Sequence, residues 1–172
     1  MTPEELFYRV FESIPRQGPG CRAATEKAFF ALRGRLPEKP RVLDIGCGKG
    51  VQTLHLARLV NGSITAVDNH QAFLDTLSSR AAAEGCRRSI TTVNASMDAL
   101  PFGDGEFDLI WSEGSIFIMG LAKGLCAWKR HLDHGGAIVV SDATWFRPDP
   151  PEEILAFWAK EGGGIMTEAE KR

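Results

Sequence analysis

The sequence predicts an α/β fold, in which a mainly parallel sheet is covered by helices on both faces. Short apolar runs alternate along the chain with stretches in which apolar residues recur every three or four positions. Strands that are apolar along their whole length are typical of a parallel sheet that is buried on both faces. The 172 residues, 44% of them hydrophobic, are enough to form one such core.

The chain is expected to begin with an amphipathic helix. Thr2-Pro3-Glu4-Glu5 is typical of a helix start, with Thr2 as the N-cap and a glutamate three residues later. Residues at helical spacing then predict one apolar face: Leu6, Phe7, Val10, Phe11 and Ile14.

A loop and a second helix are expected to follow. Pro15 and the cluster Gly18-Pro19-Gly20 end the first helix. The second helix is expected over about residues 23–36, and Pro37 and Pro40 separate it from the first strand. Its inward-facing residues are expected to be Phe29, Phe30 and Leu32.

From Arg41 onward, strands and helices alternate. The predicted strands are Val42–Ile45, Ile64–Val67, Ile90–Val93, Phe107–Trp111 and Ala137–Ser141. The predicted helices are Val51–Val60, Gln71–Ala83 and a segment marked by Leu121, Leu125, Trp128 and Leu132. A turn at His134-Gly135-Gly136 is expected to lead into the fifth strand.

Composition excludes several classes of protein. The formal net charge of −2 gives no basic surface for nucleic acid or for an anionic membrane. No apolar run approaches the roughly 18 residues that would span a bilayer, and the acidic N-terminus is not a signal peptide. The four cysteines lie far apart without a CxxC pair, which is typical of reduced thiols. We therefore expect a soluble cytoplasmic protein.

The stretch VLDIGCGKG, residues 42–50, predicts a backbone loop pressed against a ligand. A P-loop is excluded because Lys49 is followed by Gly50 rather than by Ser or Thr. A dinucleotide fingerprint is disfavoured because its third glycine position is occupied by Val51. A third interpretation is a ligand with an aminoacyl tail. Asp44 could accept a hydrogen bond from the ammonium group of such a tail. The remaining alternative is a turn that needs glycine only for its dihedral angles.

Asp68 indicates that the ligand contains an adenosine. It ends the second predicted strand 18 residues beyond Gly50, close to the ~20 that separate a glycine loop from an acid binding ribose hydroxyls. Such a carboxylate serves NAD and S-adenosylmethionine alike, so it does not choose between them. The alternative is an aspartate that caps the next helix.

Four segments in this order and spacing resemble the class I S-adenosylmethionine-dependent methyltransferases, and in particular their small-molecule branch. The segments are VLDIGCGKG, ITAVDNH, NASMDALPFGDGEFDLIWSEG and HGGAIVVSD, within about residues 41–142. The resemblance implies a Rossmann-like doubly wound sheet, S-adenosylmethionine as the cofactor, and methyl transfer to a small molecule.

The resemblance also implies which residues bind the cofactor. The methionine part is expected at Asp44, Gly46, Cys47 and Gly48, with Gly50 opening the next helix. Asp68 corresponds to the ribose acid and Asn69 to the position beside the adenine. Many relatives have Gly-Asp-Ala after the third strand, where this chain has Ala95-Ser96-Met97-Asp98. Ser96 or Asp98 is therefore expected to contact the adenine amino group and Met97 to lie against the ring, with core packing as the alternative for Met97.

The end of the fourth strand is expected to lie beside the methyl-bearing sulfur. Ser112 is assigned to the cofactor, and Glu113 is the candidate catalytic group facing the acceptor, with local backbone bonding as its alternative. The loop Arg16-Gln17-Gly18-Pro19-Gly20 resembles a segment in some relatives that folds over the methionine end, with Gln17 as a binding group; an ordinary interhelical turn is the alternative. Residues 1–40 are thus expected to be helices and a covering loop, and residues 41–172 the cofactor-binding domain.

The sequence leaves the chemistry of the acceptor open. A sulfonium is a good leaving group, so a base is needed only for some acceptors. The four histidines do not predict a metal site. The alternatives to a methyltransferase are a non-catalytic S-adenosylmethionine-binding module and an NAD-dependent oxidoreductase.

Family domains carry two more strands after the fifth, and we expect both to be missing here. After Asp142 we expect one helix over Glu152–Lys160, a break at Gly162-Gly163-Gly164 and the start of another helix at 168–172. The chain is then expected to be a truncated or partly retained version of a longer protein. Its fifth strand would be an unpaired edge, or would pair with another molecule.

Overall fold

The computed structural model describes residues 1–160 and 164–172, apart from the side chain of Glu4, and the main sheet has five parallel strands. These strands are β1 (Arg41–Ile45), β2 (Ser63–Asp68), β3 (Ile90–Asn94), β4 (Phe107–Glu113) and β5 (Leu132–Ser141). Each predicted strand is present, and all the ladders of the main sheet are parallel. The predicted α/β class is therefore confirmed.

The strand order is β3-β2-β1-β4-β5. The chain first moves outward from β1 to β3, and then returns to the other side of β1 for β4 and β5. The order therefore reverses between β1 and β4, where Val42 lies opposite Leu109 and Asp44 opposite Trp111. In open α/β sheets, ligands bind beyond the carboxyl ends of the strands at such a reversal.

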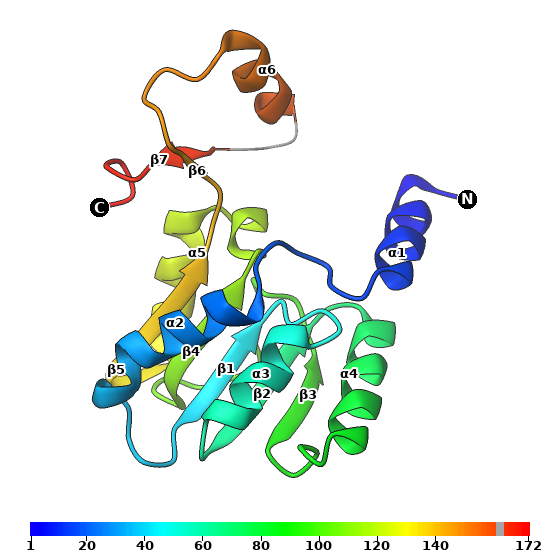
Figure 1. Cartoon of the computed structure of the whole chain (residues 1–172), viewed down its shortest axis with the longest axis vertical. Helices are drawn as coiled ribbons and strands as arrows, with labels where there is room; N and C mark the ends of the chain where they lie inside the picture. The colour runs from blue at the N-terminus through cyan, green and yellow to red at the C-terminus, as the bar shows by residue number, and fades with distance from the viewer. Residues whose placement is uncertain (161–163) are drawn as a thin grey trace.

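Helices and loops cover both faces of the sheet. One face packs against α2 (Arg22–Leu32), α3 (Val51–Leu59) and α4 (Gln71–Ala83) through Phe29, Leu56 and Leu74, among others. The other packs against α5 (Leu121–Trp128) and the short 3-10 helix at Ile116–Ile118. Figure 1 shows α2 and α3 in front of the sheet. β1 is therefore buried on both faces.

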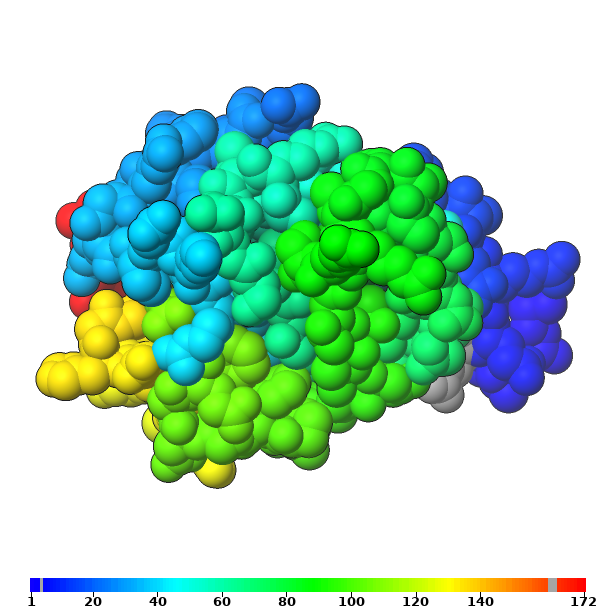
Figure 2. Space-filling model, turned by 90° about the horizontal axis from the view of Figure 1, so that it is seen from below, coloured from blue at the N-terminus to red at the C-terminus, as the bar shows by residue number. Residues whose placement is uncertain are grey.

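The first helix, α1 (Pro3–Ser13), begins as predicted: Thr2 accepts from the backbone of Glu5, and the Glu5 side chain accepts from the backbone of Thr2. Its apolar face, however, is not covered, because Leu6, Phe7 and Val10 are 54%, 52% and 50% exposed. The helix instead packs through Tyr8, whose ring stacks on His70 with centroids 4.0 Å apart. In Figure 2 the N-terminal residues project from the body of the molecule.

Two helix predictions near the sheet are partly wrong. The second helix ends at Leu32 and continues as a 3-10 turn over Arg33–Arg35, and Phe30, which was expected to face inward, is 53% exposed. α5 ends at Trp128, and Leu132, expected on that helix, begins β5. The predicted turn at His134-Gly135-Gly136 lies inside β5, at the shift in register between Phe107 and Leu109.

The C-terminal residues form an arm on the carboxyl side of the sheet (Figure 1). It contains the predicted helix α6 (Glu152–Lys160) and two strands that the sequence did not predict, β6 (Thr144–Trp145) and β7 (Met166–Thr167), which pair with each other. Residues 168–171 form a turn rather than a helix. Lys171 fastens the arm by donating to Asp142 Oδ2 at 2.6 Å.

The predicted break at Gly162 and Gly163 lies outside the described residues. Within the described residues, β5 is an edge of the main sheet, as predicted. Association with another molecule through that edge stays a prediction.

Candidate functional site

The glycine loop after β1 has the backbone shape that its three glycines allow. Gly46, Gly48 and Gly50 all have positive φ, at 71°, 53° and 74°. A Cβ on Gly46 would lie 2.6 Å from the Cβ of Ser115 and closer still to its hydroxyl, and a Cβ on Gly50 would overlap the side chain of Leu77. Glycine is therefore required for conformation and for space, and the loop lies directly on its neighbours.

Asp44, at the end of β1, is fully buried. Its Oδ2 accepts from the Thr53 hydroxyl at 2.6 Å, but Oδ1 has no hydrogen-bond partner among the described residues. Burial disfavours the charged form and raises the pKa of Asp44 to about 7. A buried carboxylate with a free oxygen is suited to accept from a cationic ligand group.

Asp68 ends β2 and faces the glycine loop. Its Oδ2 accepts from the Gly48 amide at 2.9 Å, and its Oδ1 accepts from the His70 amide at 3.0 Å. Burial raises its pKa above the ordinary value. The predicted ribose acid therefore lies beside the loop, and the neighbouring Asn69 is exposed on the same edge.

The structure brings the segment after β3 to the same place. The Ala95 amide donates to the carbonyl of Asp68 at 3.1 Å, and the Met97 methyl lies 3.7 Å from the position of a Cβ on Gly46. Met97 is half-buried, whereas Ser96 and Asp98 are exposed. These are the positions that the resemblance assigns to the adenine, and the assignment of each remains a prediction.

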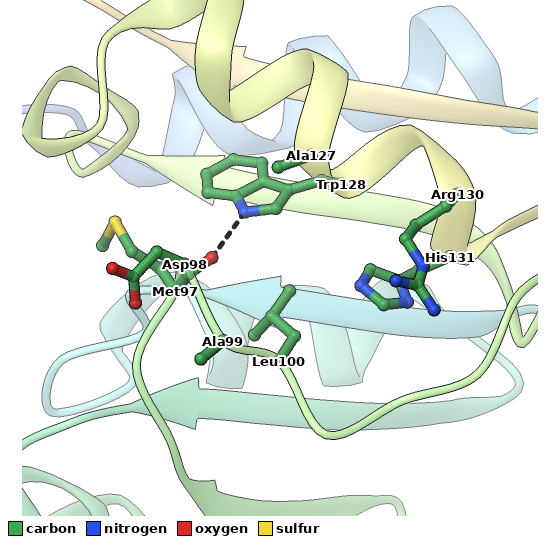
Figure 3. Close-up of a pocket in the computed structure, with 8 residues that line it drawn as sticks. All are labelled: Met97, Asp98, Ala99, Leu100, Ala127, Trp128, Arg130 and His131. Atoms are coloured by element: carbon green, nitrogen blue, oxygen red, sulfur yellow. Dashed lines mark hydrogen bonds between the residues drawn. The ribbon is translucent and has the colours of Figure 1, made fainter.

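A cavity of about 260 Å³ lies between residues 97–100 on one side and the end of α5 with the 3-10 helix Lys129–His131 on the other. Figure 3 shows Leu100 and Trp128 on opposite sides of it, and the indole nitrogen of Trp128 donating to the carbonyl of Met97, at 2.8 Å. Trp128 thereby fixes the backbone of the segment from α5.

Ser112 and the glycine loop are joined by a buried serine pair. The hydroxyls of Ser112 and Ser115 are 2.6 Å apart, and Ser115 donates to the carbonyl of Ile45 at 3.0 Å. The end of β4 therefore supports the end of β1 at the point where the strand order reverses. A direct contact of Ser112 with the cofactor stays a prediction.

The carboxylate of Glu113, the candidate catalytic residue, accepts hydrogen bonds from three side chains. Its Oε1 accepts from Thr25 at 2.7 Å and from the Trp111 indole at 2.9 Å, and its Oε2 accepts from Arg16 at 2.7 Å. These partners are side chains, not the local backbone amides that were the alternative. The acceptor-facing role of Glu113 stays a prediction, while the contacts tie the end of β4 to the N-terminal segment.

The N-terminal segment lies on the glycine loop through Gln17. The Gln17 Oε1 accepts from the Lys49 amide at 3.0 Å, and its Nε2 donates to the carbonyls of Phe11 and Ile14 at 3.1 and 2.9 Å. The Lys49 ammonium in turn donates to the carbonyls of Ile14, at 3.1 Å, and of Glu12. The predicted loop therefore lies over Gly48 and Lys49.

Sequence reasoning missed Arg16, Lys49 and Ser115. Arg16 stood inside the loop that was singled out, and Lys49 inside the glycine motif, but neither motif shows which side chains meet across the fold. Ser115 has no local signal at all, since its importance comes from its contact with Gly46.

Two further observations concern the whole site and chain. Within residues 1–160 and 164–172, no group of three or more His, Cys, Asp or Glu side chains is placed to hold a metal ion. In the same residues, no helix has the length and apolarity needed to cross a membrane.

Comparisons with known proteins identify the family to which the chain is similar. Residues 42–136, more than half of the chain, match the family described as Methyltransferase domain. The uncharacterized methyltransferase YodH of Bacillus subtilis is 30% identical over 130 residues, covering 76% of this chain and 54% of that protein. The dimethylglycine N-methyltransferase of Parasynechococcus marenigrum is 31% identical over 119 residues, covering 69% and 42%. The chain thus spans about half the length of these curated relatives.

Solved structures show the same fold. The S-adenosylmethionine-dependent methyltransferase of Geobacter sulfurreducens, solved with S-adenosylhomocysteine, aligns with a TM-score of 0.79 and 24% identity, covering 96% of this chain and 66% of that one. YjhP of E. coli aligns with a TM-score of 0.79 and 19% identity, covering 95% and 66%. The chain therefore belongs to the methyltransferase domain family of class I S-adenosylmethionine-dependent methyltransferases.

Proposed function

We propose that this chain binds S-adenosylmethionine and transfers its methyl group to a small-molecule acceptor. One observation carries the proposal: Asp44 is buried beside a three-glycine loop with one carboxylate oxygen unpaired. A phosphate-bearing ligand would gain nothing from this carboxylate, whereas the ammonium of a methionine tail would pair with it. Asp68, at the end of the next strand, supports the proposal as an acceptor for ribose hydroxyls.

The residues of the site fit such a ligand. S-adenosylmethionine would supply a methyl group on a sulfonium, which leaves readily in an in-line displacement. The task of the protein is then to orient the two reactants and exclude water, and good orientation is worth about 7–11 kcal/mol. The rigid ends of β1, β2 and β4 hold Asp44, Asp68 and Glu113 for this purpose. Glu113 is the candidate base for an acceptor that needs one.

A small-molecule acceptor is supported by a relative. The Parasynechococcus protein, 31% identical to this chain, is named for methyl transfer to dimethylglycine. The three carboxylates around the site also make it less suitable for the phosphates of nucleic acid.

Titration calorimetry tests the cofactor assignment. We expect heat of binding with S-adenosylmethionine and S-adenosylhomocysteine and none with NAD, because Asp44 and the glycine loop suit an aminoacyl tail. Binding of NAD alone would overturn the proposal. Formation of S-adenosylhomocysteine with a panel of amine, thiol, hydroxyl and carbon acceptors would then separate an enzyme from a binding module.

Asp68→Ala should weaken cofactor binding while leaving the protein folded. Ribose hydroxyls would lose a charged acceptor, which costs about 1.5–3 kcal/mol, or roughly 10- to 150-fold in dissociation constant. Asp75→Ala, an exposed aspartate on α4, is the matched control and should bind normally. Unchanged affinity in folded Asp68→Ala protein would remove Asp68 from the site.

A further inference from the structure

Two large apolar side chains are exposed just beyond the carboxyl end of β4. The strand ends at Glu113, and the short 3-10 helix Ile116–Ile118 follows it. Ile116 is completely buried, whereas Phe117 and Ile118 are 59% and 67% exposed. Apolar side chains that are scattered singly over a surface need no explanation, but two neighbours beside a candidate site indicate a place where a ligand binds.

The backbone that carries these two side chains is firmly held. Ser115, at the start of the 3-10 helix, donates to the carbonyl of Ile45 at 3.0 Å, and its hydroxyl lies 2.6 Å from that of Ser112. A Cβ on Gly46 would overlap the side chain of Ser115, so the start of the helix lies directly on the glycine loop. The exposed pair is therefore presented from a fixed position next to the loop that is proposed to bind the cofactor.

The C-terminal arm begins beside the same turn. The amide of Gly114 donates to the hydroxyl of Ser141, the last residue of β5, at 2.8 Å. The arm then continues on the carboxyl side of the sheet (Figure 1). It adds further apolar side chains on that side, and those that are exposed are Phe146, Ile154, Leu155, Phe157 and Trp158.

The carboxylates at the ends of β4 and β5 are each matched by a cation. Arg16 donates to Glu113 at 2.7 Å, and Lys171 donates to Asp142 at 2.6 Å. All four side chains are at most 18% exposed. A charged ligand that entered beside them would lose its water without gaining a counter-charge, whereas an apolar ligand would cover exposed apolar surface.

We propose that Phe117 and Ile118 bind the methyl acceptor, and that this acceptor is an uncharged small molecule with an apolar body. The proposal rests on the proposed function, which leaves the chemistry of the acceptor open. In the transfer, a lone pair of the acceptor forms a bond to the methyl carbon, and the carbon–sulfur bond breaks with its electron pair kept by sulfur. A hydroxyl or thiol acceptor then releases its proton to water.

The area of the exposed pair fits a small molecule and is too small for a second copy of the chain. An aromatic side chain buries about 150–250 Å² at most, whereas a stable interface between proteins buries about 1,200–2,000 Å² in total. Two side chains on one 3-10 helix can therefore cover a ring system, but they cannot hold a protein partner by themselves.

The test uses three probes that share one naphthalene ring system. At neutral pH, 2-naphthol is uncharged, 2-naphthoate is an anion and 2-naphthylmethylamine is a cation. Calorimetry on the chain saturated with S-adenosylhomocysteine should show that 2-naphthol binds about 10-fold more tightly than either charged probe. All three probes bury the same ring, but only the charged ones lose the hydration of an ion.

Serine substitutions test which residues bind the ring. Phe117→Ser and Ile118→Ser should each weaken 2-naphthol by about 10-fold, because apolar contact area is lost. Both side chains are exposed, so both variants should still fold and bind S-adenosylhomocysteine as the unmodified chain does. Phe30→Ser is the matched control: Phe30 lies on α2, is 53% exposed, and should bind 2-naphthol normally when replaced.

Four results would overturn the proposal. The first is that 2-naphthol fails to bind the saturated chain, and the second is that a charged probe binds at least as tightly. The third is an equal loss in Phe30→Ser and Phe117→Ser, which would mean that the ring adsorbs to any exposed apolar side chain. The fourth is a dimer in sedimentation that Phe117→Ser separates, because a second copy would then cover the pair.

The same titrations separate this proposal from the proposed function. A chain that does not bind S-adenosylhomocysteine contradicts the proposed function, and the acceptor site fails with it. A chain that binds S-adenosylhomocysteine but shows no preference for 2-naphthol contradicts the acceptor site alone.

Discussion

Asp44→Asn should make the protein more stable than the unmodified chain at neutral pH, and the advantage should grow with pH. In the folded state the pKa of Asp44 is raised by burial from 3.8 to about 7. The unfolded chain therefore releases this proton first, and folding loses stability as pH rises between these two values. At about 1.4 kcal/mol per pKa unit, the ionised carboxylate costs up to about 4 kcal/mol above pH 7. An amide in its place carries no charge and can still accept from Thr53.

Chemical denaturation at pH 5 and pH 8 measures this effect. The advantage of Asp44→Asn should increase by about 2–3 kcal/mol between the two pH values. Asp108→Asn is a control of opposite sign, because Arg41 holds the pKa of Asp108 below its ordinary value. That variant should be less stable than the unmodified chain by the same amount at pH 5 and pH 8, because the stabilisation by a carboxyl with a lowered pKa is lost only below about pH 4. If Asp44→Asn were instead less stable than the unmodified chain, by the same free energy of unfolding at every pH, then Asp44 would be ionised in the folded protein at little cost.

The same variant should lose cofactor affinity. If Asp44 accepts from the ammonium of the methionine tail, its replacement by a neutral amide should weaken S-adenosylhomocysteine by about 10- to 100-fold. A more stable protein that binds its ligand poorly is the expected outcome at a site that keeps a buried charge for function. Calorimetry at pH 8, where the unmodified carboxylate is ionised, gives the largest contrast.

Gly46→Ala should destabilise the protein by about 2–5 kcal/mol. The backbone of Gly46 has a φ of 71°, which costs an L residue about 1–2 kcal/mol. The new methyl group would also lie 2.6 Å from the Cβ of Ser115, which is buried and bonded to Ile45 and Ser112. Overpacking of this kind typically costs about 1–3 kcal/mol more.

Two other glycines separate these causes. Gly85 has a φ of 73° with nothing within 4 Å of a new Cβ, so Gly85→Ala should show the cost of the backbone alone. Gly34 has neither a positive φ nor a neighbour within 4 Å, so Gly34→Ala should change little. Denaturant unfolding of the three variants measures the difference. Equal costs for Gly46→Ala and Gly85→Ala would show that Ser115 moves aside freely.

The sequence predicted elements well where the pattern itself determines them. A run such as Val42–Ile45 followed by glycines is a strand and a turn in almost any context, and the structure has both. The period of a helix, by contrast, shows that an apolar face exists but not that anything covers it. Leu6, Phe7 and Val10 kept their helical spacing and remained exposed. Leu132 matches the helical period by spacing alone, and in the structure it is the first residue of β5.

The site was predictable to the same extent. Asp44 and Asp68 end strands, and parallel strands bring their carboxyl ends together whatever the side chains are. The partners of Glu113 could not be foreseen, because Arg16 is 97 residues away in sequence and Thr25 is 88 away. Such contacts are decided by how α2 and its preceding loop dock on the sheet, and a single sequence carries no direct record of that docking.

The difference in side-chain burial between the central strands and the outlying helices implies a gradient in the rate of amide hydrogen exchange. Val42, Leu43, Leu109 and Ile110, on β1 and β4, are completely buried, whereas no described side chain of α1 or α6 is buried. Amides on the central strands should therefore exchange only when the whole fold opens, and those on the two marginal helices through local fraying. The strand ends that carry the residues proposed to bind the cofactor are thus expected to belong to the part of the chain that opens least. We expect α1 and α6 to unfold and refold locally many times before the central strands open once.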